Sequence, residues 1–220
     1  MQIRCKKTDL LNSVNISLRA VTSKTTLPIL ECIVIEAQDN IIKLISNNQE
    51  LGIETIVKGE IIENGSIAIN AKLFSEIIRK LPDSDVTFTT NDSFMANIQC
   101  EKAKFNLMGK ASDEFPLLPT VETDKSIRVS DFALKEIIHQ TIFSVSDNES
   151  NKIMTGELFE IKGDIFKVVS LDGHRISIRK IQLHESYEDT RVIVPGKTLQ
   201  EISKICLLYT SPSPRDVEES

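Results

Sequence analysis

The sequence predicts an α+β protein of two similar domains, with strands in the majority and two helices in each domain. Three observations lead to this prediction: a length of 220 residues, short strand-like segments beside amphipathic helical patterns, and an internal repeat. Two domains of about 110 residues each are of ordinary globular size. An apolar content of 40% with 26% charged residues is typical of folded chains rather than disordered ones.

The repeat is visible in two pairs of segments. Residues 41–46 read Ile-Ile-Lys-Leu-Ile-Ser, and residues 165–170 read Ile-Phe-Lys-Val-Val-Ser, 124 positions later. Residues 67–72 (Ile-Ala-Ile-Asn-Ala-Lys) correspond to residues 192–197 (Val-Ile-Val-Pro-Gly-Lys) at an offset of 125. Two matches at nearly the same offset indicate a duplicated domain.

Each repeat is predicted to begin with a short strand and an amphipathic helix. The strands cover residues 3–5 and 127–129, and Thr8 and Ser130 are the expected helix caps. Apolar residues then recur three or four positions apart, which favours helices. These residues are Leu11, Val14, Leu18 and Val21 in the first repeat, and Leu134, Ile137, Ile138 and Ile142 in the second.

A second helix is predicted in each repeat, after residues 67–72 and 192–197. Strands at residues 86–90, 95–100 and 104–108 then close the first repeat. The apolar face of its second helix is expected to consist of Leu73, Phe74, Ile77, Ile78 and Leu81.

The domain boundaries follow from the repeat. We expect a first domain at residues 1–120, a linker at 121–126 and a second domain at 127–205. Residues 206–220 have no counterpart in the first repeat and are rich in Ser and Pro. They are interpreted as a non-native tail that cuts the second domain short, or else as a natural tail.

Composition excludes several classes of protein. A net charge of −6 argues against non-specific coating of nucleic acid, because Lys and Arg supply that affinity. The four cysteines lie far apart, which argues against a zinc site or a disulfide framework. No secretory signal or apolar run of about 18 residues is present, so we expect no membrane span and a cytoplasmic location.

Four motifs in register carry a family resemblance. They are residues 26–30 (Thr-Leu-Pro-Ile-Leu), 113–116 (Asp-Glu-Phe-Pro), 172–176 (Asp-Gly-His-Arg-Ile) and 192–195 (Val-Ile-Val-Pro). With the repeat length, they resemble the bacterial DNA polymerase III beta subunit, the replicative sliding clamp. The resemblance implies a ring of two protomers, each with three similar domains, whose helices line a hole for duplex DNA. It also implies a non-catalytic processivity factor without cofactors, of which the third domain is absent here.

The resemblance implies a DNA-contacting surface on the helices. Charged positions opposite the apolar stripes are usually only a solvated face, and the resemblance favours a lining role instead. The candidates on helices are Arg19, Lys72, Arg79, Lys80, Lys135, His139 and Lys197, and Lys24 and Asn148 match DNA-contacting loop positions of the family. Gly196 stands where a further basic residue is common, so contact there is expected to be weaker.

A cleft for partner peptides is the second implied surface. In the family, polymerases, the clamp loader and repair proteins insert a short, partly hydrophobic peptide between the second and third domains. Leu171 and the stretch 151–154 depart from the family pattern, so peptide preference is expected to differ. The matching positions are Met154, Leu171, Gly173, His174, Arg175 and Ile176.

The protomer junction is the third implied surface. An alternation of charged and apolar residues suits an edge strand that pairs with a partner protomer, although an ordinary outer strand shows the same pattern. The residues concerned are Lys102, Lys104, Phe105 and Leu107.

Two rival functions remain at this point. An enzyme is conceivable with Asp172 and His174 as an acid/base pair. However, Asp-Gly is first a turn signal, and no catalytic triad order, glycine-rich phosphate loop or metal-ligand cluster accompanies it. The second rival is a two-domain peptide-docking module that never encircles DNA.

Overall fold

The computed structural model describes residues 1–22, 25–116, 118–119, 126–148 and 150–209. It divides into two compact units, Met1–Thr120 and Val121–Ser220. The chain is α+β with antiparallel sheets, as the sequence predicted. Of the expected linker, residues 121–125 lie outside the described part, as do Lys24 and residues 210–220 of the expected tail.

The first unit contains two antiparallel sheets. The five-stranded sheet has the order β5-β1-β7-β8-β9, and the four-stranded sheet has the order β4-β3-β2-β6. The strands of the first sheet are β1 (Gln2–Lys6), β5 (Gly59–Glu63), β7 (Asp85–Thr90), β8 (Met95–Cys100) and β9 (Ala103–Met108). Those of the second are β2 (Cys32–Gln38), β3 (Ile41–Asn47), β4 (Gly52–Val57) and β6 (Gly65–Asn70).

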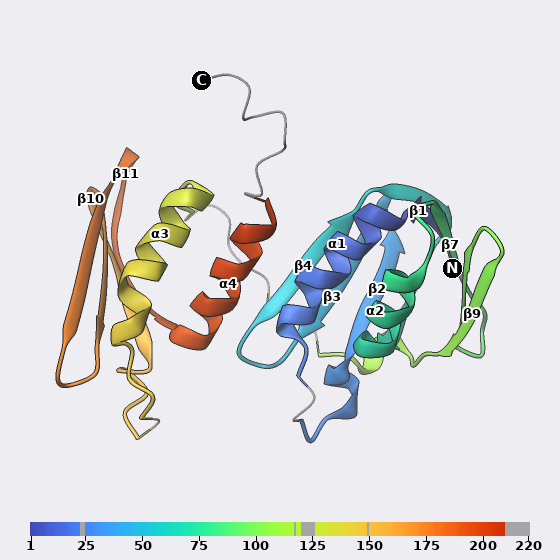
Figure 1. The fold of residues 1–220 in the computed structure, drawn as a ribbon, viewed down its shortest axis with the longest axis horizontal. Helices are drawn as coiled ribbons and strands as arrows, with labels where there is room; N and C mark the ends of the chain where they lie inside the picture. The colour runs from blue at the N-terminus through green and yellow to red at the C-terminus, as the bar shows by residue number, and fades with distance from the viewer. Residues whose placement is uncertain (23–24, 117, 120–125, 149, 210–220) are drawn as a thin grey trace. The chain divides into compact units, whose positions relative to one another are not determined.

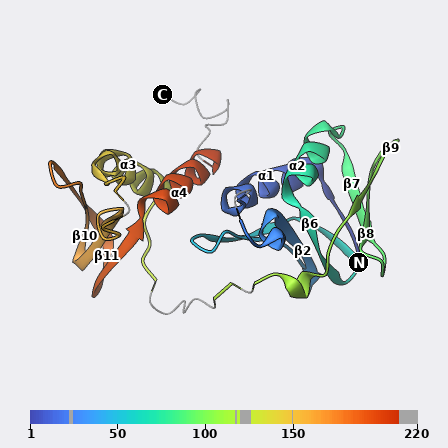
Figure 2. The same ribbon diagram turned by 90° about the horizontal axis from the view of Figure 1, so that it is seen from below.

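Two helices of this unit lie side by side on one side of the sheets (Figures 1 and 2). They are α1 (Lys7–Ser17), continued by a 3₁₀ turn (Leu18–Ala20), and α2 (Ala71–Lys80). Phe74 and Ile78 of α2 are fully buried, and Phe74 meets Phe88 edge-on, with ring centroids 6.0 Å apart. The helices and both sheets therefore enclose one hydrophobic core.

Two details of the predicted helices were wrong. Thr8 is not the cap of α1, because the cap position is Lys6, two residues earlier, and the helix begins at Lys7. The N–H of Lys7 donates to the carbonyl of Ser84 (3.2 Å) and fixes the junction. Leu73 is 50% exposed instead of lying on the apolar face of α2, where Ile77 packs against the core.

The second unit has a long two-stranded ribbon and two helices. The strands β10 (Gly156–Leu171) and β11 (Ile176–Pro195) pair along their length, with irregular register around Gly163. The helices α3 (Asp131–Thr141) and α4 (Gly196–Tyr209) pack on the ribbon around a second core. Ser130 caps α3 as predicted, since its side chain accepts from the N–H of Ala133 (3.2 Å).

The strand predicted at residues 127–129 is not formed. The N–H of Arg128 donates to the hydroxyl of Tyr187 (3.2 Å) instead of to a strand carbonyl, and Val129 packs against the core without pairing. Residues 127–129 have a strand-like composition and precede a helix cap, as β1 does. However, β1 is held by pairing with β5 and β7, and no strand in the described chain pairs with residues 127–129 in this way.

The repeat is visible in single contacts. Ser46 and Ser170, which end the two matching segments 41–46 and 165–170, are both buried. The hydroxyl of Ser46 donates to the carbonyl of Ser17 (2.7 Å), and that of Ser170 donates to the carbonyl of Thr141 (2.6 Å). Donor and acceptor are both displaced by 124 residues, so each unit ties its first helix to its sheet through the same buried hydrogen bond.

Candidate functional site

The helix surface of the first unit carries three of the predicted DNA-contacting residues. Lys72, Arg79 and Lys80 are exposed on α2, because the helix turns its apolar side into the core. The Arg79 guanidinium donates to the side-chain oxygen of Asn15 on α1 (3.1 Å), which orients it across the two helices. Arg19 is half-buried at the end of the 3₁₀ turn and is already engaged in an interaction.

The corresponding residues of the second unit are more varied. Lys197 is exposed in the first turn of α4, although it has an interaction partner, and His139 is exposed on α3. Lys135 is half-buried. Asn148 lies in an exposed loop, where its side-chain oxygen accepts the N–H of Ser150 (3.0 Å).

The four helices are less acidic than the chain as a whole. Their sequences contain seven Lys or Arg against five Asp or Glu, whereas the whole chain contains 26 against 32. In the first unit the helices carry four basic and two acidic residues, and in the second unit three of each. The helix surface of the first unit is therefore mildly basic on an acidic protein.

The predicted peptide-binding residues gather at one corner of the second unit. Leu171 and Ile176 pair at the end of the β10–β11 ribbon, and Gly173 lies in the turn between them with φ +90°, a conformation that favours glycine. The hydroxyls of Ser144 and Ser177 are 2.6 Å apart, and the N–H of Ser146 donates to the Met154 carbonyl (2.9 Å). These bonds connect the turn to the segment that holds Met154.

Asp172 organises the turn. Its carboxylate accepts the N–H groups of His174 (3.0 Å) and Arg175 (3.1 Å) and binds the Arg175 guanidinium (2.6 Å). The His174 N–H and then the Arg175 side chain lower the pKa of Asp172 below its usual range. Asp172 is therefore a charged structural anchor of the turn rather than a proton donor, and both of its carboxylate oxygens are engaged by the turn itself.

The sequence interpretation missed Phe143 at this corner. The Arg175 guanidinium lies 5.9 Å from the centroid of the Phe143 ring, and the ring is 57% exposed. Ile176 and Ile153 nearby are 61% and 68% exposed. In the sequence, the only indication of a role for Phe143 is that this aromatic residue directly follows the predicted helix. The corner therefore offers apolar side chains beside an oriented cation.

The predicted junction strand is β9, at the edge of the five-stranded sheet. Lys102 lies in the turn just before β9 (Ala103–Met108) and not on the strand as predicted. Lys104 is exposed, Phe105 is 37% exposed, and Leu107 packs partly against the core. Met108, which the prediction did not include, is 66% exposed at the end of the strand. The outer backbone groups of β9 face no other strand in the described part of the chain.

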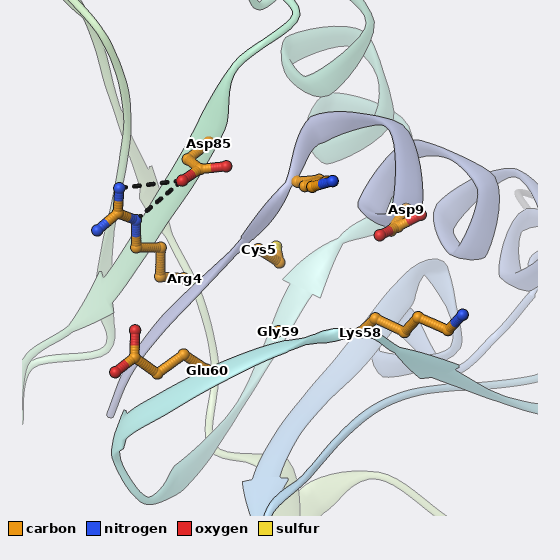
Figure 3. Close-up of a pocket in the computed structure, with 8 residues that line it drawn as sticks. Arg4, Cys5, Asp9, Lys58, Gly59, Glu60 and Asp85 are labelled. Atoms are coloured by element: carbon orange, nitrogen blue, oxygen red, sulfur yellow. Dashed lines mark hydrogen bonds and ion pairs between the residues drawn. The ribbon is translucent and has the colours of Figure 1, made fainter.

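A hollow of about 460 Å³ lies at one end of the first unit (Figure 3). Arg4 and Asp85 form an ion pair (2.9 Å) on one side of it, and Cys5 lies between this pair and Asp9. Burial, and then the charge of Asp9, raises the pKa of the Cys5 thiol to about 12. This cysteine is therefore a poor nucleophile, and the lining mixes both signs of charge. The hollow does not support catalysis.

All four cysteines are buried thiols. Within the described residues, no three His, Cys, Asp or Glu side chains are grouped so that they could hold a metal ion. Among the same residues, no helix has both the length and the apolar character needed to cross a membrane.

Two family models match nearly the whole chain. The model of the N-terminal domain of the DNA polymerase III beta subunit matches residues 1–119, and the model of its central domain matches residues 128–209. The beta sliding clamp of Staphylococcus epidermidis is 38% identical over 213 residues, which are 93% of this chain and 56% of that protein. The chain thus spans about half the length of the curated relatives it matches.

Solved structures of similar proteins have the same fold. A putative DNA polymerase III beta subunit from Eubacterium rectale is 59% identical with a TM-score of 0.91, over 94% of this chain and 56% of that one. The DNA polymerase sliding clamp of Bacillus subtilis is 34% identical with a TM-score of 0.89, over 93% and 56%.

Proposed function

The chain belongs to the bacterial DNA polymerase III beta subunit family, and on this premise we propose that it acts as part of a DNA sliding clamp. In this function a ring encircles duplex DNA and tethers the replicative polymerase to its template without catalysing a reaction. In this proposal residues 1–120 form the first clamp domain, residues 127–205 belong to the second and residues 206–220 are a tail, although residues 206–209 still continue α4 and lie within the match to the central domain. The site of action is the bacterial chromosome in the cytoplasm.

The observation that carries the proposal is the contrast between the helix surface and the rest of the chain. A ring holds DNA by topology, so its lining needs only a weak positive surplus to remain mobile on the duplex. Strong phosphate contacts would act as friction and would be highly sensitive to salt. A mildly basic helix surface on a protein of net charge −6 meets this requirement.

The proposed DNA contacts are the exposed basic residues of the helices and the polar loops next to them. On α2 they are Lys72, Arg79 and Lys80, with Arg79 oriented by Asn15. The complete proposed set is Lys24, Lys72, Arg79, Lys80, Asn148 and Lys197, of which Lys24 lies outside the described residues.

Charge reversal tests this surface. The variant Lys72→Glu with Lys80→Glu should weaken binding of the chain to a labelled 30-base-pair duplex at low salt by about tenfold or more. The control variant Lys58→Glu with Lys180→Glu makes the same charge change on exposed strand and loop positions and should change affinity by about twofold or less. Equal losses in the two variants would show that net charge alone determines DNA binding, and the helix surface would not be the contact.

The corner around Asp172 is the proposed docking site for partner peptides from the polymerase III catalytic subunit, the clamp loader and repair proteins. Its contact residues are Met154, Leu171, Gly173, His174, Arg175 and Ile176. Apolar side chains beside an oriented guanidinium suit a peptide with a hydrophobic anchor.

Binding of the purified polymerase III catalytic subunit to the immobilised chain tests the corner. His174→Ala with Met154→Ala should weaken this binding, whereas Asn48→Ala with Gln49→Ala, at the repeat-related turn of the first unit, should not. Unchanged affinity in the first variant would contradict the assignment.

The edge strand β9 is the proposed protomer junction of the complete ring, through Lys102, Lys104, Phe105 and Leu107. Its unpaired outer edge and partly exposed apolar residues are suited to strand pairing with a second protomer. A closed ring then needs a loader to reach circular DNA.

A further inference from the structure

A second hollow, of about 320 Å³, lies on the face of the four-stranded sheet that is turned away from the helices. Ser112, Asp113, Phe115, Pro116 and Leu118 form one wall of the hollow. The floor is apolar, with Val34, Ile45 and Phe115, and the rim carries Glu36, Glu54 and Asp113. It therefore belongs entirely to the first unit and is separate from the peptide corner of the second.

The wall of the hollow is firmly attached to the sheet. The hydroxyls of Ser66 and Ser112 are 2.6 Å apart, and the Phe115 ring is only 6% exposed in a small hydrophobic cluster. At the other end, a Cβ added to Gly52 would lie 2.4 Å from Leu118, so the glycine provides the space that Leu118 occupies. The hollow is thus largely formed before any ligand arrives.

Its charge is clearly negative. None of the described lining residues is Lys or Arg. The nearest cation in the strand register is Lys43, which lies opposite Glu36 and binds the Glu54 carboxylate (3.0 Å). Among the lining residues and Lys43, one lysine stands against three carboxylates, so the lining has a negative surplus. Lys110, which pairs with Ala68, is a second cation on this face of the sheet.

The repeat shows that this chemistry is particular to the first unit. The counterpart of Glu54 is Ile178, and the counterpart of Ser66 is Arg191. In the second unit Arg191 and Lys167 bind the one carboxylate of Glu160, so the related face there is cationic. Two faces of opposite charge select different partners.

We propose that the hollow is a docking site for a basic segment of a partner protein, in which an Arg or Lys stands next to an aliphatic residue. The aliphatic side chain and the methylene stem of the cation pack on Val34, Ile45 and Phe115. The charged end then reaches the Glu36 and Asp113 carboxylates, and arginine suits such a pair of acceptors best. The proposal is independent of the DNA contacts and of the peptide corner.

Binding of small labelled peptides to the 220-residue chain tests this site. The probe is acetyl-Leu-Arg-Leu-amide, compared with the same peptide carrying citrulline, which keeps the shape of arginine without its charge. The arginine peptide should bind with a dissociation constant of about 0.1–1 mM, and citrulline should weaken binding by about fivefold or more. Equal binding of the two peptides would overturn the proposal.

Variants locate the site. Glu36→Gln with Asp113→Asn should weaken the arginine peptide by about fivefold, whereas Glu60→Gln with Asp92→Asn, which removes the same charge elsewhere in the first unit, should change it less than about twofold. Duplex binding should be unaffected by either pair. If Glu36→Gln with Asp113→Asn has no effect on peptide binding, the proposal is wrong. It is also wrong if the chain self-associates in sedimentation and this double variant abolishes the self-association, because the occupant of the hollow would then be a second copy of the chain.

Discussion

Glu157 is a buried carboxylate in the core of the second unit, and it makes this unit sensitive to pH. Its side chain is fully buried on β10, opposite Val194, and neither carboxylate oxygen has a hydrogen-bond partner in the described structure. The repeat-related residue of the first unit is Ile33, also fully buried. Burial raises the pKa of Glu157 to about 7.

The size of the effect follows from the pKa difference between the folded and unfolded states. Because the folded pKa is raised from 4.5 to about 7, the folded unit holds a proton that the unfolded chain releases. Stability is therefore unaffected below pH 4.5, falls between pH 4.5 and 7, and stays low at higher pH. The full loss in the free energy of unfolding is about 3 kcal/mol, of which about 2 kcal/mol falls between pH 5 and pH 8.

Tyrosine fluorescence measures this unit selectively. The chain has no tryptophan, and its two tyrosines, Tyr187 and Tyr209, both belong to the second unit. The free energy of unfolding of Glu157→Gln and of the original chain can be measured with urea at pH 5 and at pH 8. The advantage of Glu157→Gln over the original chain should be about 2 kcal/mol larger at pH 8 than at pH 5. Glu188→Gln, at an exposed position of β11, is the matched control. If the stability difference between the Glu157 variant and the original chain is the same at both pH values, the carboxylate is not desolvated in the folded unit and the reasoning fails.

Three further predictions concern the second unit. Ser170→Ala should lower the free energy of unfolding by about 1–2 kcal/mol in the same assay, because the buried carbonyl of Thr141 loses its donor; no change would mean that the repeated bond is not stabilising. Glu160 has its pKa lowered to about 2, first by Lys167, so it stabilises the fold above pH 4.5 and this contribution is lost as the pH falls towards 2. Glu160→Gln should therefore flatten the acid limb of a stability profile, and an unchanged limb would contradict the ion cluster. Phe143→Ala should weaken binding of the polymerase III catalytic subunit by about threefold or more, through loss of an apolar contact and of the Arg175 orientation, whereas equal affinity would place the peptide elsewhere.

Part of the fold was predictable because the repeat supplied two observations of several elements. The matching Lys and Ser positions of residues 41–46 and 165–170 correspond to paired strands in both units, and Ser46 and Ser170 prove to be buried for the same reason. The amphipathic spacing located α2 and α3 to within a residue or two. Errors arose where tertiary contacts outweigh local pattern: at Thr8, where the Ser84 carbonyl sets the helix start, and at residues 127–129.

The candidate sites were predictable to different degrees. Residues within one motif, such as Asp172 to Ile176, stay together because a tight turn holds them. The position of Phe143 beside Arg175 could not be predicted from the sequence, because it depends on the contact between Ser144 and Ser177, which are 33 residues apart. The hollow beside Phe115 could not be predicted either, because residues 112–116 contribute to it together with strands that lie much earlier in the chain.

Topological retention on DNA tests the sliding-clamp proposal most directly. The chain can be completed by grafting onto it the remaining part of the Eubacterium rectale relative, of which it matches 56%. A clamp loader would then place the completed protein on nicked circular plasmid. We expect the completed protein to remain on the circle through high-salt gel filtration and to be lost within minutes once the plasmid is cut at one site. Equal retention on circular and linear DNA, or loss from both at high salt, would contradict encirclement.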